Sequence, residues 1–256
     1  MRLISLILLF LLSGTVSAQK VEWYTTTQTS PWVKQKVKPE RVTTGAEIVL
    51  DPTLRLQLIM GIGGCFNEMG WDALNALSAE DREAVLQAIF SKDGACFNYC
   101  RLPMGANDFA LSFYSSADVA GDFNLVNFNI DRDRYILIPY IKAARQINPD
   151  LRIWASPWCP PAWMKTNNHY ASAVRPSGEK DVNGLLPREA ITEFSTGFRM
   201  EEGYLKTYAD YFARFIKAYE AEGLPLECIH VQNEPCSNQV FPSCNCLLYT
   251  SPSPRD

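Results

Sequence analysis

The alternation of short apolar segments with amphipathic helical segments most constrains what this chain can fold into. Apolar residues recur at helical spacing from residue 78 onwards, over 134–146 and over 202–222. Short apolar segments typical of strands lie around these helices, at 56–63, 97–102, 151–155 and 228–232. Strands that alternate with helices predict parallel βαβ units with right-handed crossovers. We therefore expect an α/β fold.

Polar residues gather just after the predicted strands, as at Asn67-Glu68, Asp108 and Asn233-Glu234. A (β/α)8 barrel keeps its active site on the loops at the carboxyl ends of its strands. A doubly wound sheet shares the alternation, but its nucleotide-binding form needs Gly-x-Gly-x-x-Gly after a strand. Gly61-Ile62-Gly63-Gly64 lacks the third glycine. Because only four strands are found, we predict the N-terminal half of a (β/α)8 TIM barrel over residues 58–244.

The first 57 residues have a different character. Residues 1–18 have the features of a signal peptide, with Arg2, an apolar run over 3–12 and small residues before a cleavage site after Ala18. That run is too short for a membrane helix, which needs roughly 20 residues. We expect export to a periplasmic or extracellular location, with no integral membrane segment left after cleavage. Residues 19–57 alternate Thr, Val, Lys and Glu among prolines and predict a small β segment.

Charge and histidine content exclude several classes of function. The net charge is −4 and no basic block is present, so a nucleic-acid partner is not expected. The chain has two histidines, His169 and His230, and neither has a second histidine at ligand spacing. A multi-histidine metal centre is therefore excluded and a histidine-based triad is poorly supported. Catalysis is expected to depend on carboxylates, without metal or cofactor.

The eight cysteines do not form a zinc ribbon, since no two-residue gap is repeated. We expect most of them to be small buried hydrophobic residues, namely Cys65, Cys96, Cys100, Cys159 and Cys228. Cys236 and Cys244 flank a short loop and are the one candidate disulfide, which an oxidising compartment would permit. Spacing alone leaves that pairing open.

Four segments, in order along residues 55–244, resemble glycoside hydrolase family 30. This family of retaining β-glycosidases includes glucosylceramidase and microbial β-1,6-glucanases. The segments are Gly61-Ile62-Gly63-Gly64-Cys65-Phe66-Asn67-Glu68, Arg101-Leu102-Pro103-Met104-Gly105-Ala106-Asn107-Asp108-Phe109, Ala155-Ser156-Pro157-Trp158-Cys159-Pro160-Pro161-Ala162-Trp163-Met164-Lys165-Thr166-Asn167 and Gln232-Asn233-Glu234-Pro235. Asn-Glu-Pro alone would be weak evidence for the resemblance, whereas four matches in the family's order are specific to the family.

The resemblance implies a role for Glu234 as the catalytic acid/base. Glu234 would protonate the glycosidic oxygen and later activate water, so it must begin protonated, in surroundings that the preceding apolar strand and Pro235 would provide. Asn233 would bind the 2-hydroxyl of the sugar. The competing interpretations are a solvated turn glutamate and an asparagine that stabilises a turn.

The resemblance also assigns substrate-binding roles to Arg101, Asp108 and Trp158. Asp108 would accept hydrogen bonds from sugar hydroxyls and Arg101 would orient neighbouring carboxylates, although a structural ion pair between them remains open. Trp158 would form an aromatic wall against the sugar, while a core position describes Trp163 better. Glu68 would support these residues from behind, and a long loop over 167–199 would cover the cleft.

The second carboxylate of the family is missing from this sequence. A retaining glycosidase needs a nucleophile about 5 to 5.5 Å from its acid/base, and the family places it at the end of the seventh strand. Residues 245–256 match nothing in the family, so we expect them to be a non-native tail. We accordingly expect the 256-residue chain to be an unstable, aggregation-prone and inactive fragment.

The function implied is that of an exported retaining glycosidase acting on β-1,6-glucan or related β-glucosides. One alternative is a glucosylceramidase in sphingolipid metabolism, with the same fold and chemistry. Another is a carbohydrate-binding protein that has lost its nucleophile. The expected partner in the first case is a β-glucoside or β-glucan substrate.

Overall fold

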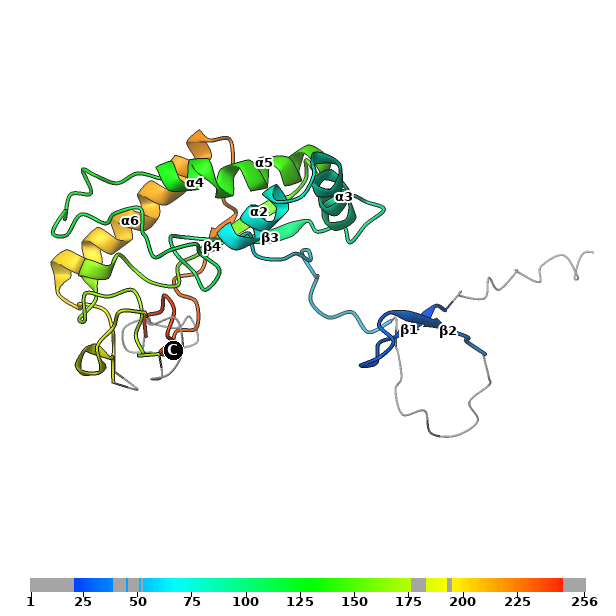
Figure 1. Ribbon diagram of the computed structural model, residues 1–256, viewed down its shortest axis with the longest axis horizontal. Coiled ribbons are helices and arrows are strands. Elements are labelled where there is room, and N and C mark those ends of the chain that lie inside the picture. The colour runs from blue at the N-terminus through cyan, green and yellow to red at the C-terminus, as the bar shows by residue number, and fades with distance from the viewer. Residues whose placement is uncertain are drawn as a thin grey trace, which may run out of the picture. The chain divides into compact units, whose positions relative to one another are not determined.

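The computed structural model describes residues 21–38, 45, 51, 53–175, 183–192 and 195–245. The chain divides into two compact units, residues 1–57 and residues 58–256, and each is described by itself (Figure 1). The expected signal peptide and residues 246–256 of the expected tail lie outside the described residues.

The first unit contains a small antiparallel pair of strands. Strand β1 (Trp23–Thr25) pairs with β2 (Val33–Gln35), with Trp23 opposite Gln35. Tyr24 stacks on Trp32 with ring centroids 5.3 Å apart. These are short extended strands of the kind that the Thr, Val and Lys alternation predicts.

The second unit contains a parallel sheet whose strands follow the order of the sequence. Strands β3 (Tyr99–Pro103), β4 (Arg152–Ser156) and β5 (Cys228–Ile229) lie side by side in that order. Arg101 is opposite Trp154, and Trp154 is opposite Cys228. The parallel βαβ units predicted from these three segments are confirmed.

The strand predicted over 56–63 is wrong. No strand is assigned over these residues, but their end runs along β3. The Ile62 carbonyl oxygen accepts from the Tyr99 amide at 3.2 Å, and the Gly64 carbonyl oxygen accepts from the Arg101 amide at 2.9 Å, next to a parallel bridge between Cys65 and Arg101. Gly63 approaches β3 so closely that a Cβ atom there would lie 2.2 Å from the Tyr99 carbonyl oxygen. The apolar residues before Gly63 are exposed, with Leu58 at 87%. Residues 56–61 have the composition of a strand, but no strand in the described residues pairs with them.

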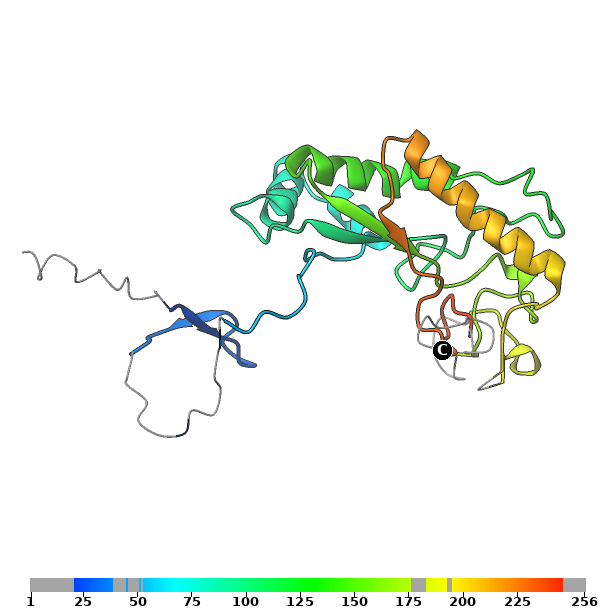
Figure 2. The same cartoon turned by 180° about the vertical axis from the view of Figure 1, so that it is seen from behind.

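The helices cover one face of this sheet. They are α2 (Glu68–Asn75), α3 (Ala79–Phe90), α4 (Asp131–Tyr135), α5 (Leu137–Ile147) and α6 (Glu202–Ala221). Figure 2 shows α5 and α6 on the same side of the strands, where Ile141 and Phe215 pack in one core with Leu102 and Ile153. Tyr211 and Tyr219 of α6 belong to the same core, so the aromatic face of this helix serves helix-to-sheet packing.

The helix boundaries follow local signals where such signals exist. Ser78 caps α3, its hydroxyl accepting a hydrogen bond from the Asp81 amide at 3.0 Å, and the helix expected from residue 78 onwards is confirmed. The helix expected over 134–146 is instead two helices that meet at Ile136. Helix α2 was not predicted, although Asn67 caps it by accepting from the Gly70 amide at 2.7 Å. Asn67 had been interpreted only as a polar residue after a strand.

Burial alternates along the strands and separates a packed face from a polar face. Cys100 and Leu102 of β3 are buried toward the helices, whereas Tyr99 and Arg101 are only partly buried. Because side chains of a strand alternate between faces, Arg101 lies on the face opposite the helices. Trp154 of β4 follows the same pattern and lies beside it.

Two expectations about the cysteines need correction. Cys236 is a free, exposed thiol, so the candidate Cys236–Cys244 disulfide is not formed. Cys244 is buried, and the two residues lie in different environments that their spacing could not reveal. Cys100 and Cys159 are buried as predicted, but Cys96 and Cys228 are exposed, at a turn and in the last strand of the sheet.

Candidate active site

Side chains from β4 and from the turns after β4 and β5 meet at Arg101, which lies in β3. The Arg101 guanidinium donates from Nε to Ser156 Oγ at 2.8 Å and from Nη2 to Asn233 Oδ1 at 2.9 Å. Ser156 ends β4, and Asn233 follows β5. Arg101 therefore ties together the carboxyl ends of neighbouring strands, the position at which parallel sheets bind their ligands.

Two tryptophans surround the same guanidinium. Its central carbon lies 3.9 Å from the ring centroid of Trp158 and 5.0 Å from that of Trp154. Burial lowers the pKa of Arg101, while the nearby carboxylates of Asp108 and Glu234 act in the opposite direction. The result is a partly desolvated cation held within range of two carboxylates.

Trp158 is 6% exposed, and Arg101 stacks on its ring. In this arrangement Trp158 supports Arg101, and its expected role as a wall against a sugar remains a prediction. Trp163 is buried and donates from Nε1 to the Ala117 carbonyl oxygen at 2.8 Å. The core position expected for Trp163 is confirmed.

The turn after β5 carries the Asn233-Glu234 pair. The Asn233 amide donates to the Pro157 carbonyl oxygen at 2.8 Å, and the Gln232 side chain donates to the Trp158 carbonyl oxygen at 2.8 Å. These bonds fasten the turn to the end of β4. Glu234 then adopts a φ of +41°, in the left-handed region that residues other than glycine seldom occupy. Strained backbone of this kind is concentrated at functional sites.

Glu234 itself is exposed, which corrects the enclosed environment expected for it. Its carboxylate accepts a hydrogen bond from Gln239 Nε2 at 3.2 Å. Strand β5 is the last strand of the sheet, so no neighbouring strand among the described residues covers this side of Glu234. The apolar strand before it and Pro235 after it do not enclose the carboxylate by themselves.

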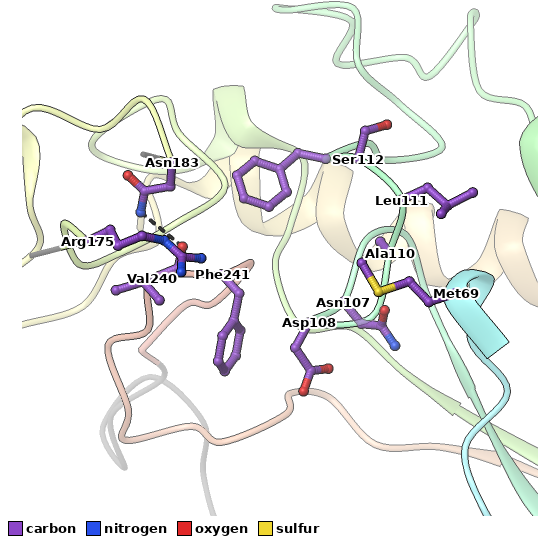
Figure 3. Close-up of a pocket in the computed structure, with 11 residues that line it drawn as sticks. Met69, Asn107, Asp108, Ala110, Leu111, Ser112, Arg175, Asn183, Val240 and Phe241 are labelled. Atoms are coloured by element: carbon purple, nitrogen blue, oxygen red, sulfur yellow. Dashed lines mark hydrogen bonds between the residues drawn. The ribbon is translucent and has the colours of Figure 1, made fainter. Parts of the chain in front are cut away.

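Asp108 lines a cleft of about 390 Å³ that lies next to this cluster (Figure 3). Its carboxylate points into the open space, with Asn107 beside it and Phe241 across from it. Asn183 lines the cleft from the other side, where its Nδ2 donates to the Val240 carbonyl oxygen at 2.9 Å. The cleft thus combines carboxylate and amide groups with apolar surface, the composition of a small-molecule site.

The structure brings the expected site residues together in two groups. Arg101, Trp158 and Asn233 are in direct contact, and Glu234 follows Asn233. Asp108 faces the cleft, and in the described part of the chain no ion pair joins it to Arg101. The structural ion pair left open as an alternative is therefore not formed there. Glu68 lies at the first turn of α2 and contacts Arg132.

Sequence reasoning missed several residues around these groups. Ser156 lies in one of the four matched segments, but no role was predicted for it. In the structure its hydroxyl accepts a hydrogen bond from Arg101. Asn183 and Arg175 line the cleft and belong to the long loop that was expected to cover it, but nothing marked them individually. Gln239, which contacts Glu234, follows the last recognised motif.

The described residues also bear on metals and membranes. Nowhere among them do three His, Cys, Asp or Glu side chains gather in a way that could hold a metal ion. None of the helices that the structure describes has the length and apolar character needed to cross a membrane.

The sequence comparisons find a family that is similar to part of the chain. The glycosyl hydrolase family 30 TIM-barrel domain matches residues 59–184. The chain is 29% identical over 224 residues to the lysosomal acid glucosylceramidase of Mus musculus, covering 86% of this chain and 39% of that protein. It is 28% identical over 192 residues to an endo-1,6-beta-D-glucanase of Neurospora crassa, covering 74% of this chain and 36% of that protein. The chain thus spans less than half the length of either relative.

A solved structure is also similar to this chain. SrfJ from Salmonella typhimurium superposes with a TM-score of 0.68 at 27% identity, covering 85% of this chain and 44% of that one. The resemblance found in the sequence is confirmed: residues 59–184 match the TIM-barrel domain of glycosyl hydrolase family 30, and the chain's homologues in that family are glycosidases.

Proposed function

We propose that this chain is the N-terminal half of the barrel of an exported retaining β-glycosidase, which hydrolyses β-glucosidic bonds by double displacement. The observation that carries the proposal is the Asn233-Glu234 turn at the carboxyl end of the sheet, tied to Arg101 by a 2.9 Å hydrogen bond. A carboxylate beside an amide, next to a cleft with a second carboxylate, supports the chemistry of glycoside cleavage.

In this proposal Glu234 is the acid/base. It donates a proton to the glycosidic oxygen as the bond to the sugar breaks, then takes a proton from the water that hydrolyses the glycosyl-enzyme. Asn233 Oδ1 accepts from Arg101, so its Nδ2 is the group that donates to the 2-hydroxyl of the sugar. Asp108 accepts hydrogen bonds from other sugar hydroxyls in the cleft.

The nucleophile is proposed to come from a later strand of the barrel, outside this sequence. Two observations support this. The chain corresponds to only 36% to 39% of the length of its relatives. The sheet in the described residues has three strands where a closed barrel of this type has eight. The missing strands would also enclose Glu234 and favour its protonated form.

The first test is to sequence the source DNA through and beyond the codon for Cys244. We expect a reading frame that continues into further strand and helix units with a glutamate at the end of the seventh strand. The protein from that frame should hydrolyse an aryl β-glucoside, and Glu234→Gln should lower kcat at least about 100-fold. Azide should restore turnover in Glu234→Ala and give a β-glucosyl azide, because azide needs no general base.

The chain by itself should show no turnover. Hydrolysis by the purified 256-residue chain that Glu234→Gln abolishes would contradict the placement of the nucleophile. A continuous protein that binds glucosides without hydrolysing them would instead support the carbohydrate-binding alternative.

The preferred substrate is proposed to be a β-1,6-glucan or a related β-glucoside. The similarity to an endo-1,6-beta-D-glucanase supports this, while the similarity to a lysosomal acid glucosylceramidase supports the second candidate, a glucosylceramide. A survey of leaving groups separates the two. Only a lipid-active enzyme should hydrolyse glucosylceramide at rates comparable to those for gentio-oligosaccharides.

Export is proposed from the composition of residues 1–18. Expression from the native leader should yield a secreted protein whose N-terminal sequencing begins at Gln19. Retention of the intact leader on an intracellular product would contradict the proposal.

A further inference from the structure

An ion pair between a buried glutamate and a partly buried arginine lies behind the loop that carries Asp108. Glu68 is 1% exposed at the first turn of α2. Arg132, in α4, donates from Nε to Glu68 Oε1 at 2.7 Å and from Nη2 to Glu68 Oε2 at 2.6 Å. Both carboxylate oxygens are thus engaged by one guanidinium in a bidentate pair, which fixes orientation as well as distance.

Both members of this pair also bind the loop that follows Asp108. The Leu111 amide donates to Glu68 Oε2 at 2.7 Å, and Arg132 Nη1 donates to Ser112 Oγ at 2.8 Å. Leu111 and Ser112 line the cleft together with Asp108. The ion pair therefore contacts one wall of the cleft from its buried side.

The base of the same loop is closed by a second set of contacts. The Ala106 amide donates to the Tyr114 carbonyl oxygen at 3.0 Å, so the loop returns to its own start. The guanidinium of Arg132 lies 4.0 Å from the ring centroid of Tyr114. Arg132 thus contacts both the middle and the end of the loop.

The position of the Asp108 side chain depends on the backbone of this loop. It is exposed at the edge of the cleft, and the described residues supply no ion pair that would orient it. Inside the loop, Asn107 Oδ1 accepts from the Phe109 amide at 3.0 Å, which sets the turn just after Asp108. The Phe109 carbonyl oxygen in turn accepts from the Met69 amide at 3.0 Å.

We propose that Glu68 and Arg132 are positioning residues, which hold the loop over 107–113 so that the Asp108 carboxylate faces the sugar in the cleft. The inference rests on the proposed function, because it assigns Asp108 to sugar binding. Stability alone does not account for the pair, since a buried ion pair gains little over well-packed apolar residues of similar volume. Precise placement of a polar loop is what the bidentate geometry supplies.

The first experiment measures the order of the loop directly. Backbone hydrogen exchange is compared among the parent chain, Glu68→Gln, Arg132→Lys and Glu83→Gln. Glu83 is an exposed glutamate of α3 whose side chain accepts from Gln87, so it is a matched change without a loop contact. Glu68→Gln should speed exchange of the Leu111 amide about tenfold, since the side chain loses its charge and keeps one acceptor oxygen where Glu68 has two.

Arg132→Lys provides a second test in case Glu68→Gln does not fold. It keeps the positive charge beside Glu68 but removes the two-pronged contact and shortens the reach to Ser112. Arg132→Lys should also speed exchange of the Leu111 amide, by a smaller factor. Glu83→Gln should leave exchange over 107–113 unchanged.

The second experiment tests whether the loop order serves Asp108. The affinity for methyl β-glucoside is measured in a double-mutant cycle of Glu68→Gln and Asp108→Asn. Glu68→Gln should weaken binding about tenfold when Asp108 is present and have no further effect when residue 108 is already Asn. A purely structural role would weaken binding equally in both backgrounds.

The outcomes separate this inference from the proposed function. Unchanged exchange at Leu111 in both Glu68→Gln and Arg132→Lys would overturn the positioning role, as would additive effects in the cycle. Failure of the protein from the continuous reading frame, in which the cycle is measured, to bind methyl β-glucoside would count against the proposed function. If exchange increased in that case, the pair would order the loop without serving sugar binding, and the inference would also fail.

Discussion

At the scale of single residues, the site depends on one arginine of β3, whose contacts come from β4 and from the turns after β4 and β5. Arg101 donates to Ser156 and Asn233 and stacks on Trp158. A lysine has a point charge in place of a planar fork, so it cannot make both hydrogen bonds and the stack at once.

Arg101→Lys should therefore lower the free energy of unfolding by about 1–2 kcal/mol, through lost hydrogen bonds and the lost stack. Urea denaturation measures the change. Arg82→Lys is the matched control, because Arg82 also lies over a tryptophan, at 6.0 Å from the ring centroid, but donates to the side chain of Asn75 only and joins no strand ends. Its effect should stay within about 0.5 kcal/mol. Equal losses in the two variants would show that Arg101 does not hold the strand ends together.

The sequence identified the residues of this cluster through motifs, but not their partners. Asn233 and Glu234 stand just after a strand and Arg101 lies near the end of one, where parallel folds place functional groups. Asn183 and Gln239 reach the site through loops whose paths depend on long-range contacts, such as the bond from Asn183 to Val240. No local pattern encodes such a contact.

At the scale of elements, local patterns again predict some strands and helices, while others depend on contacts that the sequence does not show. Strands β3 and β4 could be predicted from their apolar residues. These residues are apolar because they are buried against α5 and α6. The segment 56–61 has a similar composition but remains outside the sheet, since strand formation depends on a partner as well as on composition. Helix α2 was missed because its only local signal, the Asn67 cap, precedes a short element.

A buried carboxylate joins α4 to α6. Asp133 accepts hydrogen bonds from Tyr114 Oη at 2.9 Å and Tyr219 Oη at 2.7 Å. Burial raises the pKa of Asp133 from 3.8 to about 6, and the charge of Glu68 adds to this. The two tyrosine hydrogen bonds and the charge of Arg132 oppose the rise without cancelling it.

Stability should therefore depend on pH through Asp133. The folded chain binds this proton more tightly than the unfolded chain, so the free energy of unfolding should fall as the pH rises from about 4 to about 6 and then level off. Urea denaturation across this range measures the slope, and Asp133→Asn should remove Asp133's part of it. The same slope in the variant would assign the pH dependence to other groups.

At the scale of the whole molecule, exposed apolar surface is the main liability. Leu58, Ile59, Met60 and Ile62 are 55% to 87% exposed in one continuous segment. Contiguous apolar surface of this kind promotes self-association.

The purified chain should therefore associate at micromolar concentration, and replacing Leu58 and Ile59 together by Ser should reduce this. Light scattering measures the association. Val126→Ser is the control, because Val126 is 79% exposed but belongs to a different segment. A monomeric parent chain, or an equal effect of Val126→Ser, would show that residues 58–62 do not drive association.

The left-handed backbone of Glu234 has a consequence for how this position can vary. A glycine would adopt a φ of +41° without the steric cost that a side chain imposes, which amounts to about 1 kcal/mol. Selection for folding alone would thus favour glycine at position 234. A chain with Glu234→Gly should be the more stable molecule, and it should lose the proposed acid/base together with the carboxylate.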